Sequence, residues 1–317
     1  MSHLTSIVVP CYNEEEMIPV FFDITEKIAI PGEREYIFVN DGSTDRSLEE
    51  MKKLHKMAPD KVRYISFSRN FGKEAGMYAG LQESRGDFVV IMDVDLQDPP
   101  ELLPEMYDTL VEEKDIDSVA TRRVTRSGEP PIRSWFAKMF YKVINAISDT
   151  EIVDGARDYR MMNRKMVDSI LEVTEYNRFY KGIVNWVGFN TQYLEYENVE
   201  RHLGETTWSF WQLFKYSIDG IISYSTFPLT IVSLIGFFIF LVSIILAAVF
   251  AVRTLIFDNP VQGWTSLAVI ILGLGGLTIL SLGIIGQYLG KTFLETKNRP
   301  IYIVKETEED NADPMSD

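Results

Sequence analysis

Short apolar runs alternate with polar turns and amphipathic segments along the first 120 residues. Five of these runs have the length and apolar content of buried strands, and they lie at residues 6–10, 35–39, 62–67, 89–92 and 117–120. Strands that alternate with helices in this way form a mostly parallel sheet with helices on both faces. We therefore predict an α/β domain in which the carboxyl ends of the strands meet along one edge, where ligands bind in such sheets.

Polar turns follow the first three predicted strands, so we expect their side chains at this edge. They carry carboxylates and amides, which accept hydrogen bonds from a nucleotide base and ribose, and basic groups, which can meet phosphate. The candidates are Asn13, Glu14, Asp41, Arg69 and Lys73. Ordinary turn and capping chemistry is the alternative, and we favour it for Ser43 and Thr44.

The fourth strand runs directly into the acidic sequence D-V-D-L-Q-D-P-P at 93–100. Asp93 and Asp95 are two residues apart, which places both side chains on one side of an extended backbone. Neighbouring carboxylates repel each other, and a hard cation such as Mg²⁺ or Mn²⁺ relieves the repulsion while substrate phosphates complete its ligand shell. A solvated acidic turn is the alternative, because a D-x-D sequence is short and often matches by chance.

Composition argues against several other classes of protein. The chain has 317 residues and a net charge of −15, which argues against nonspecific nucleic-acid binding. A single cysteine excludes a disulfide framework within the chain and suits a reducing compartment. The three histidines are scattered, which points away from a zinc enzyme. No G-x-G-x-x-G or Walker lysine loop occurs, which weakens the case for a dinucleotide dehydrogenase or a P-loop enzyme.

Two long uncharged stretches lie in the C-terminal part, with 25 residues at 228–252 and 32 residues at 259–290. Each exceeds the roughly 20 residues that a helix needs to cross a bilayer. We predict two transmembrane helices, and a buried hairpin is the alternative. Glycines in the second stretch predict close packing against the first stretch or another protomer. The chain starts without a charged-then-apolar leader, and basic residues follow the second stretch, so we expect both termini in the cytoplasm.

Two amphipathic segments with aromatic residues, at 132–147 and 208–222, precede these stretches. They fit helices that lie in a membrane interface, and packing on the sheet is the alternative. A basic segment at 122–128 is expected to form a mobile loop that closes over phosphates, with Arg122 as a catalytic candidate, and a solvated basic loop is the alternative. Because the guanidinium fork matches phosphate oxygens, the candidate clamps for an acceptor phosphate are Arg126, Arg160, Arg178 and Arg201. Structural pairing with acids is the alternative for each of these arginines.

Four motifs occur in order along the chain: V-V-P-C-Y-N-E-E, V-N-D-G-S-T-D, S-R-N-F-G-K-E and D-V-D-L-Q-D-P-P-E. Together they resemble the inverting glycosyltransferases of family 2, which have the Rossmann-like GT-A fold. Within that family the sequence is most similar to the polyprenyl-phosphate glycosyltransferases, which include dolichol-phosphate mannose synthase and bacterial enzymes that act on undecaprenyl phosphate. The resemblance extends to about residue 305. No Q-x-x-R-W sequence follows, so a processive polymer synthase is less expected.

The resemblance also implies roles for individual residues. The nucleotide base and ribose would be held by Pro10, Tyr12, Glu14 and Asp41. Asp93 and Asp95, with Gln97 nearby, would hold the metal ion and the diphosphate. Asp158 would lie near the acceptor phosphate, as a general base or as a group that positions the nucleophile. A phosphate monoester is largely a dianion at neutral pH, so it needs positioning more than deprotonation.

These expectations divide the chain into four parts. A nucleotide-sugar-binding GT-A core occupies 1–130, and an acceptor region with interfacial amphipathic helices occupies 131–227. A two-helix transmembrane hairpin follows at 228–290, and a cytoplasmic tail at 291–317 is expected to be acidic and disordered at its end.

A nucleotide-sugar site tethered to a bilayer is explained if the acceptor is itself a lipid phosphate. We predict a metal-dependent inverting hexosyltransferase on the cytoplasmic face of a bacterial plasma membrane. It would move a hexose or N-acetylhexosamine, such as glucose or N-acetylglucosamine, from a UDP-linked donor to undecaprenyl phosphate. The alternatives are a transferase for another lipid or glycan, and a non-catalytic adaptor that senses a nucleotide sugar. The resemblance also implies a homo-oligomer, a flippase and an outward-facing glycosyltransferase that uses the product.

Overall fold

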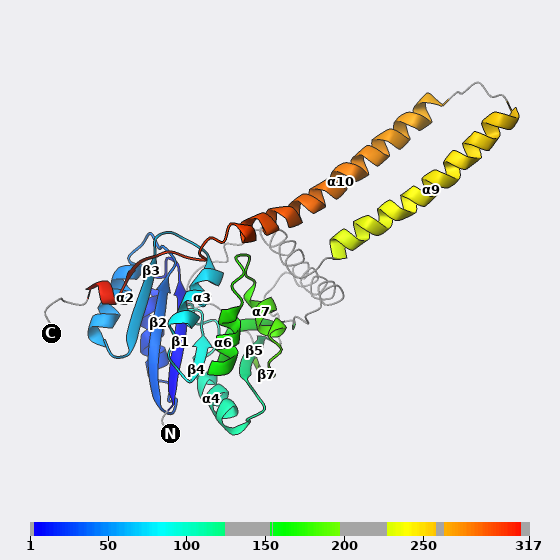
Figure 1. Cartoon of the computed structure of the whole chain (residues 1–317). Coiled ribbons are helices and arrows are strands. Elements are labelled where there is room, and N and C mark those ends of the chain that lie inside the picture. The colour runs from blue at the N-terminus through cyan, green and yellow to red at the C-terminus, as the bar shows by residue number, and fades with distance from the viewer. Residues whose placement is uncertain (1–2, 124–152, 154, 197–226, 258–262, 312–317) are drawn as a thin grey trace.

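The computed structural model describes residues 3–123, 153, 155–196, 227–257 and 263–311 (Figure 1). The predicted interfacial helices at 132–147 and 208–222 lie outside these residues, as do Arg126 and Arg201. What the sequence predicts for those segments therefore stays a prediction.

One mixed sheet forms the centre of the described structure (Figure 1). Its strands are β1 (Leu4–Cys11), β2 (Glu33–Asn40), β3 (Val62–Phe67), β4 (Phe88–Ile91), β5 (Ser118–Arg123), β6 (Ala156–Asn163), β7 (Thr191–Tyr196) and β8 (Val304–Thr307). They lie in the order β7-β5-β6-β4-β1-β2-β3-β8. β4, β1, β2 and β3 run parallel, whereas β6 and β8 run antiparallel to their neighbours. The predicted mostly parallel sheet is confirmed, and all five predicted strands are present.

Three strands, β6, β7 and β8, were not expected from the sequence. β6 reads A-R-D-Y-R-M-M-N, and its charged residues interrupt the apolar run that identifies a buried strand. β7 and β8 contain mostly polar residues, as is common for strands at the edge of a sheet. β8 also falls inside the predicted cytoplasmic tail at 291–317, so residues 304–307 of that tail form part of the sheet.

Helices cover both faces of the sheet, as predicted (Figure 1). The helices α1 (Met17–Glu26), α2 (Ser47–Met57) and α4 (Leu103–Glu112) enclose one apolar core, and α4 follows the short 3₁₀ turn η1 (Pro100–Leu102). The second core lies under α3 (Lys73–Glu83), α6 (Arg164–Glu172) and α7 (Tyr180–Trp186). Burial of apolar side chains on both faces explains why the parallel strands read as continuous apolar runs.

β1 shows how the two cores are built from one strand. Ile7 and Val9 enter the first core, and Val8 points into the second, because successive side chains of a strand alternate between faces. Gly80 lets α3 approach this strand closely, since a Cβ atom there would lie 2.1 Å from Val8 Cγ1. The close approach brings the N-terminal end of α3, which begins at Lys73, to the functional edge of the sheet.

Two long apolar helices, α9 (Phe227–Phe257) and α10 (Trp264–Thr296), project from the α/β part (Figure 1). Large side chains such as Phe237 and Ile279 are more than half exposed. Two segments, Phe227–Leu246 and Gly273–Thr296, are long and apolar enough to cross a membrane. A Cβ atom at the glycines of α10 would meet nothing within 4 Å. The predicted packing of these glycines against α9 is therefore not observed. Packing against another protomer stays a prediction.

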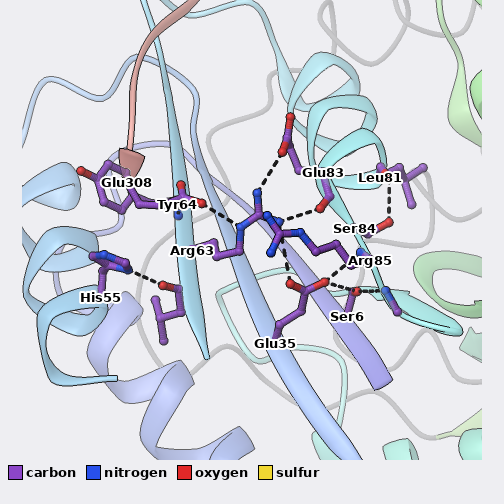
Figure 2. A network of polar contacts seen from close by, with 12 residues as sticks. Ser6, Glu35, His55, Arg63, Tyr64, Leu81, Glu83, Ser84, Arg85 and Glu308 are labelled. Atoms are coloured by element: carbon purple, nitrogen blue, oxygen red, sulfur yellow. Dashed lines mark hydrogen bonds and ion pairs between the residues drawn. The ribbon is translucent and has the colours of Figure 1, made fainter. Parts of the chain in front are cut away.

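The chain returns from α10 to the sheet, where β8 pairs with β3 and leads into the short 3₁₀ helix η2 (Glu309–Asn311). Figure 2 shows the polar network that fastens this segment. Arg63 on β3 donates through Nε to Glu308, at 2.7 Å, and through Nη2 to Glu83, at 2.9 Å. Glu35 on β2 lies 3.7 Å from the same guanidinium, and Glu306 pairs with Lys52 at 2.5 Å. Glu306 and Glu308 of the tail are therefore partners of basic residues on the folded domain.

Candidate active site

The turns after β1 and β2 are joined to each other at the carboxyl edge of the sheet. Asn13 has a φ of 56°, and its Oδ1 accepts from the backbone N–H of Thr44 at 2.8 Å. Ser43 Oγ accepts from the backbone N–H of Asn13, and Ser47 Oγ accepts from that of Glu14. Ser43 and Thr44 therefore tie the turn after β2 to Asn13 in the turn after β1. The same bonds hold Asn13 and Glu14 at the edge of the sheet.

Asp41 organises the next loop rather than standing open to solvent. Its carboxylate accepts from the backbone N–H groups of Phe71 at 2.6 Å and Gly72 at 2.9 Å, and the residue is only 4% exposed. Gly42 beside it has a φ of 66°, and a Cβ there would lie 2.3 Å from the backbone of Arg69. Burial raises the pKa of Asp41, and the two N–H groups oppose that change. Asp41 thereby places the loop that begins α3.

The D-x-D sequence lies in a turn that follows β4, not in an extended strand. Asp93, Asp95 and Gln97 are half-buried, whereas the alternate residues Val94, Leu96 and Asp98 are fully buried. The side chains of Asp93 and Asp95 are therefore both partly accessible. Leu96 adopts a φ of 54°, and the N–H of Gln97 donates to Asp95 Oδ1 at 3.2 Å, which closes the turn.

Lys73 joins two predicted site residues that are far apart in the sequence. Its ammonium lies 2.7 Å from Asp93 Oδ1 and 2.7 Å from Asp158 Oδ2. Asp158 reaches this position because β6 runs antiparallel to β4 and pairs Arg160 with Ile91, so the start of β6 lies at the carboxyl end of β4. α3, the D-x-D turn and β6 thus bring one basic and two acidic side chains together. We call Lys73, Asp93 and Asp158 the Lys73 cluster.

The charges of this cluster hold its groups in their ionised forms. Burial lowers the pKa of Lys73, but the carboxylates of Asp158 and Asp93 outweigh burial and raise that pKa above its ordinary value. Burial raises the pKa of Asp158, yet Lys73, Lys181 and Arg157 bring it far below the usual range. A carboxylate with so low a pKa is a poor proton acceptor at neutral pH. The electrostatics therefore favour a positioning role for Asp158.

A second pair beside the D-x-D turn was missed by sequence reasoning. Asp98 is 1% exposed, and its Oδ1 accepts from Arg157 Nε at 2.9 Å and from the hydroxyl of Tyr196 at 2.6 Å. Arg157 precedes Asp158 on β6, and its side chain is 28% exposed. The carboxylate of Asp98 thus fixes a partly exposed guanidinium next to the catalytic candidates.

The donor set at the edge fits a hard divalent cation only in part. Asp93 and Asp95 offer partly accessible carboxylate oxygens on one turn, which suits Mg²⁺ or Mn²⁺. Among the described residues, no group of three or more His, Cys, Asp or Glu side chains is arranged to hold a metal ion. Substrate phosphates would have to complete the shell, and Lys73 already shares the carboxylate of Asp93.

Comparison with known proteins places this site in a family. The family model described as glycosyl transferase family 2 matches residues 6–171, which include every strand-end turn described above. The chain belongs to glycosyl transferase family 2. It is therefore a glycosyltransferase, and the predicted family is confirmed.

Relatives match the family 2 chain over almost its whole length. An SfII prophage-derived bactoprenol glucosyl transferase of Shigella flexneri is 40% identical over 308 residues, which cover 96% of this chain and 99% of the relative. A prophage bactoprenol glucosyl transferase homolog of Escherichia coli (strain K12) is 40% identical and covers 95% of this chain and 98% of its own. Both relatives therefore include counterparts of α9 and α10.

A solved structure with a related arrangement is glucosyl-3-phosphoglycerate synthase of Mycobacterium tuberculosis, in complex with Mn²⁺, UDP-glucose and phosphoglyceric acid. It aligns with a TM-score of 0.49 and 18% identity, and the match covers 69% of this chain and 78% of that one.

Other predicted nucleotide-binding residues of the family 2 site lie at the same edge. Tyr12 is 47% exposed, and Pro10 is a partly buried residue near the carboxyl end of β1. The guanidinium of Arg69 lies over the ring of Phe71 at 4.0 Å and donates to the carbonyl of Asn70. Arg122 lies near the end of β5, 3.5 Å from Glu195 on β7. Arg122 is thus at the edge but outside the Lys73 cluster.

Two of the predicted phosphate clamps, Arg160 and Arg178, are among the described residues. Arg160 is 2% exposed, and its Nη1 donates to Ser118 at 2.8 Å and Thr191 at 2.9 Å, which ties β5, β6 and β7 together. The buried side chain of Arg160 is thus committed to the sheet, which argues against the predicted clamp. Arg178 stacks on the ring of Tyr78 at 4.2 Å and, with Glu74, lines a cavity of about 150 Å³ beside α3.

Arg157 and Lys181 are two charged groups near Asp158 that the sequence did not single out. Lys181 on α7 donates to the carbonyl of Ala156 at 2.8 Å and helps to lower the pKa of Asp158. Arg157 and Asp98 are 59 residues apart, and neither belongs to a short motif with the other. A buried acid in D-L-Q-D-P-P was the one available signal, since a buried carboxylate requires a partner.

Proposed function

We propose that this glycosyltransferase moves a hexose or N-acetylhexosamine from a UDP-linked sugar to undecaprenyl phosphate, with inversion at the anomeric carbon. The similarity to relatives named bactoprenol glucosyl transferase carries the proposal, because the aligned region includes the Lys73 cluster and both apolar helices. Glucose is the leading candidate for the sugar on the same ground. The Lys73 cluster supports group transfer, since it combines carboxylates and a cation where a diphosphate and a second phosphate can meet.

The turns after β1, β2 and β3 would bind the nucleotide. Tyr12, Asn13 and Glu14 offer an exposed aromatic ring and polar groups for the base and ribose, and Asp41 supports the loop that carries Arg69. Asp93 and Asp95 would hold Mg²⁺ or Mn²⁺ together with the diphosphate. Such an ion would supply Lewis-acid stabilisation of the negative charge on the departing diphosphate.

The acceptor phosphate would lie beside Asp158 and Lys73. One of its oxygens forms the new bond to the anomeric carbon while the bond from that carbon to the diphosphate breaks, and UDP leaves. The acceptor is already a dianion at neutral pH, so the step requires alignment and charge neutralisation. Lys73 would neutralise charge, and Asp158 would fix the position of the ammonium, with which it makes a 2.7 Å contact.

The path of the chain supports a membrane position for this reaction. α9 and α10 are the two candidate spans, and the segment after α10 pairs with β3 of the same sheet that precedes α9. If both helices cross a bilayer, the sheet and the tail must lie on the same side of it. We place that side in the bacterial cytoplasm. The predicted homo-oligomer, flippase and outward-facing glycosyltransferase remain parts of this proposal.

The test is transfer of radiolabelled sugar from a panel of UDP- and GDP-sugars into organic-extractable undecaprenyl phosphate, with and without EDTA. Labelled lipid from one donor, lost with EDTA, would support the reaction and identify the sugar. If no donor labels the lipid while nucleotide binding persists, a different lipid or glycan acceptor becomes the better hypothesis. Binding without transfer to any acceptor would favour the adaptor.

Replacement of Asp95 by Asn tests the metal assignment directly. Loss of one carboxylate from the D-x-D turn should lower transfer by roughly 100-fold or more, because the charge on the departing diphosphate is no longer stabilised. Turnover is measured across a titration of Mg²⁺ and Mn²⁺. Near-normal metal-dependent turnover in Asp95→Asn would refute the assignment.

A further inference from the structure

The C-terminal end of α10 is hydrogen-bonded to the loop between α6 and α7. Glu295 lies one residue before the end of α10, and its carboxylate accepts from the backbone N–H groups of Tyr176 at 3.0 Å and Asn177 at 2.9 Å. The side-chain amide of Asn177 also donates to Glu295 at 2.9 Å. Figure 1 shows the loop that follows α6 rising to meet this end of α10. One carboxylate thus makes three hydrogen bonds across the junction.

The segment just after α10 attaches to the α/β part at a second place. The hydroxyl of Tyr302 donates to Gln82 on α3 at 2.9 Å, and its ring stacks on Phe67 of β3 at 4.8 Å. The carbonyl of Ile303 accepts from the backbone N–H of Ser68 at 2.9 Å. Two attachments on different elements restrict rotation of α10 against the sheet more than either one alone.

The loop that Glu295 holds is connected on its other side to the Lys73 cluster. The backbone N–H of Tyr180, at the start of α7, donates to the carboxylate of Glu74 at 2.8 Å. Glu74 follows Lys73 in the first turn of α3, and Lys73 contacts both Asp93 and Asp158. A short series of contacts therefore runs from the end of the second apolar helix to the groups that would align the acceptor phosphate.

We propose that Glu295 is a positioning residue that sets the height and tilt of the Lys73 cluster above the membrane surface. The inference rests on the proposed function, since it requires an acceptor whose phosphate is held at the bilayer surface by its own lipid chain. A phosphate on such a chain cannot adjust its depth freely, so the protein must bring the cluster to it. Displacement by about 1 Å can cost roughly 100-fold in rate when reacting groups are aligned by binding.

The proposal predicts that loss of Glu295 affects two kinds of acceptor differently. A water-soluble, short-chain prenyl phosphate diffuses to the cluster from solution, so its transfer does not depend on how the domain sits on the membrane. Undecaprenyl phosphate in a vesicle depends on it. A general loss of folding or of donor binding would instead lower transfer to both acceptors in parallel.

The experiment compares kcat/KM for the two acceptors in the full-length protein reconstituted into vesicles. In Glu295→Ala we expect at least a tenfold loss with undecaprenyl phosphate and less than a twofold change with the short-chain acceptor. Glu295→Gln should restore part of the loss, because its amide oxygen can still accept a hydrogen bond from the loop. Glu172→Ala is the matched control, since Glu172 is an exposed acid at the end of α6, next to the same loop.

Equal losses for the two acceptors, or no loss for either, would overturn the positioning role of Glu295. A loss in Glu172→Ala as large as that in Glu295→Ala would overturn it as well. Failure of the unaltered protein to glycosylate undecaprenyl phosphate would refute the proposed function instead, so the two failures are distinguishable.

Discussion

At the scale of single residues, the Lys73 cluster has the strongest electrostatic coupling of the predicted site residues. The ammonium contacts Asp93 on one side and Asp158 on the other, and the carboxylates raise the pKa of Lys73 while Lys73 lowers that of Asp158. A substrate diphosphate that approaches Asp93 would meet a cation already in place. Lys73 is therefore a group whose loss should change both the rate and its dependence on pH.

Lys73→Gln should lower turnover roughly 100-fold, as is typical when one group that stabilises developing charge is removed. It should also shift the acidic limb of the rate profile to higher pH, because Asp158 loses the cation that lowers its pKa and becomes protonated earlier as the pH falls. Both effects are measured by recording rates over about four pH units, from about pH 4 to about pH 8, a range that includes the titration of perturbed carboxyl groups. Lys27→Gln, at an exposed position after α1, is the control. An unshifted acidic limb in Lys73→Gln would argue against this coupling.

Asp98 and Arg157 form a second charged pair, and its contribution to the free energy of unfolding can be measured. Arg157→Gln leaves the buried carboxylate of Asp98 without its cation, so we expect a loss of about 3–5 kcal/mol in the free energy of unfolding. The double variant Asp98→Asn with Arg157→Gln removes both charges and should recover most of that stability. Denaturant unfolding of the two single variants and the double variant measures the coupling. Additive losses would contradict it.

At the scale of elements, the positions of β6 and β8 in the sheet explain where their charged residues lie. β6 runs antiparallel between β4 and β5, so its charged first half lies at the functional edge while its apolar second half is buried. β8 adds an edge strand whose acidic neighbours meet Lys52 and Arg63. Residues 304–311 therefore belong to the fold of the catalytic domain.

Glu308→Gln tests that attachment. Arg63 and Glu308 are both largely buried, and removal of one charge leaves Arg63 with Glu35 and Glu83 as partners, so we expect a loss of about 1–3 kcal/mol. Glu309→Gln, at the exposed neighbouring position, should change stability by less than about 0.5 kcal/mol. Thermal unfolding in detergent compares the two variants. Equal stability of both would show that the tail contact contributes nothing measurable.

At the scale of the whole molecule, the two apolar helices and the returning tail define a topology that can be measured. Cys11 is buried, so a single introduced cysteine reports on its own position. In intact bacteria an impermeant maleimide should label Gly263→Cys, at the start of α10, and should label Asp310→Cys only after the membrane is permeabilised. The physical reason is that two spans return the chain to the side where it started. Labelling of Asp310→Cys in intact cells would refute the cytoplasmic placement.

Features that repeat over a short length could be predicted from the sequence alone. Five strands, the helices between them and the two apolar helices follow from local periodicity and length. The four motifs in order led to the family, which the comparisons confirm. Even the edge where the polar turns gather follows from the direction of parallel strands.

Only the tertiary structure decided which charged groups meet. Lys73 and Asp158 are 85 residues apart, and Arg63 and Glu308 are 245 apart, so no spacing rule connects them. The same lack of local signal explains why Arg160, expected at a phosphate, is buried against Ser118 and Thr191 instead. The side-chain pattern of a strand repeats within a few residues, whereas the partner of a charged side chain depends on how distant strands are ordered in the sheet.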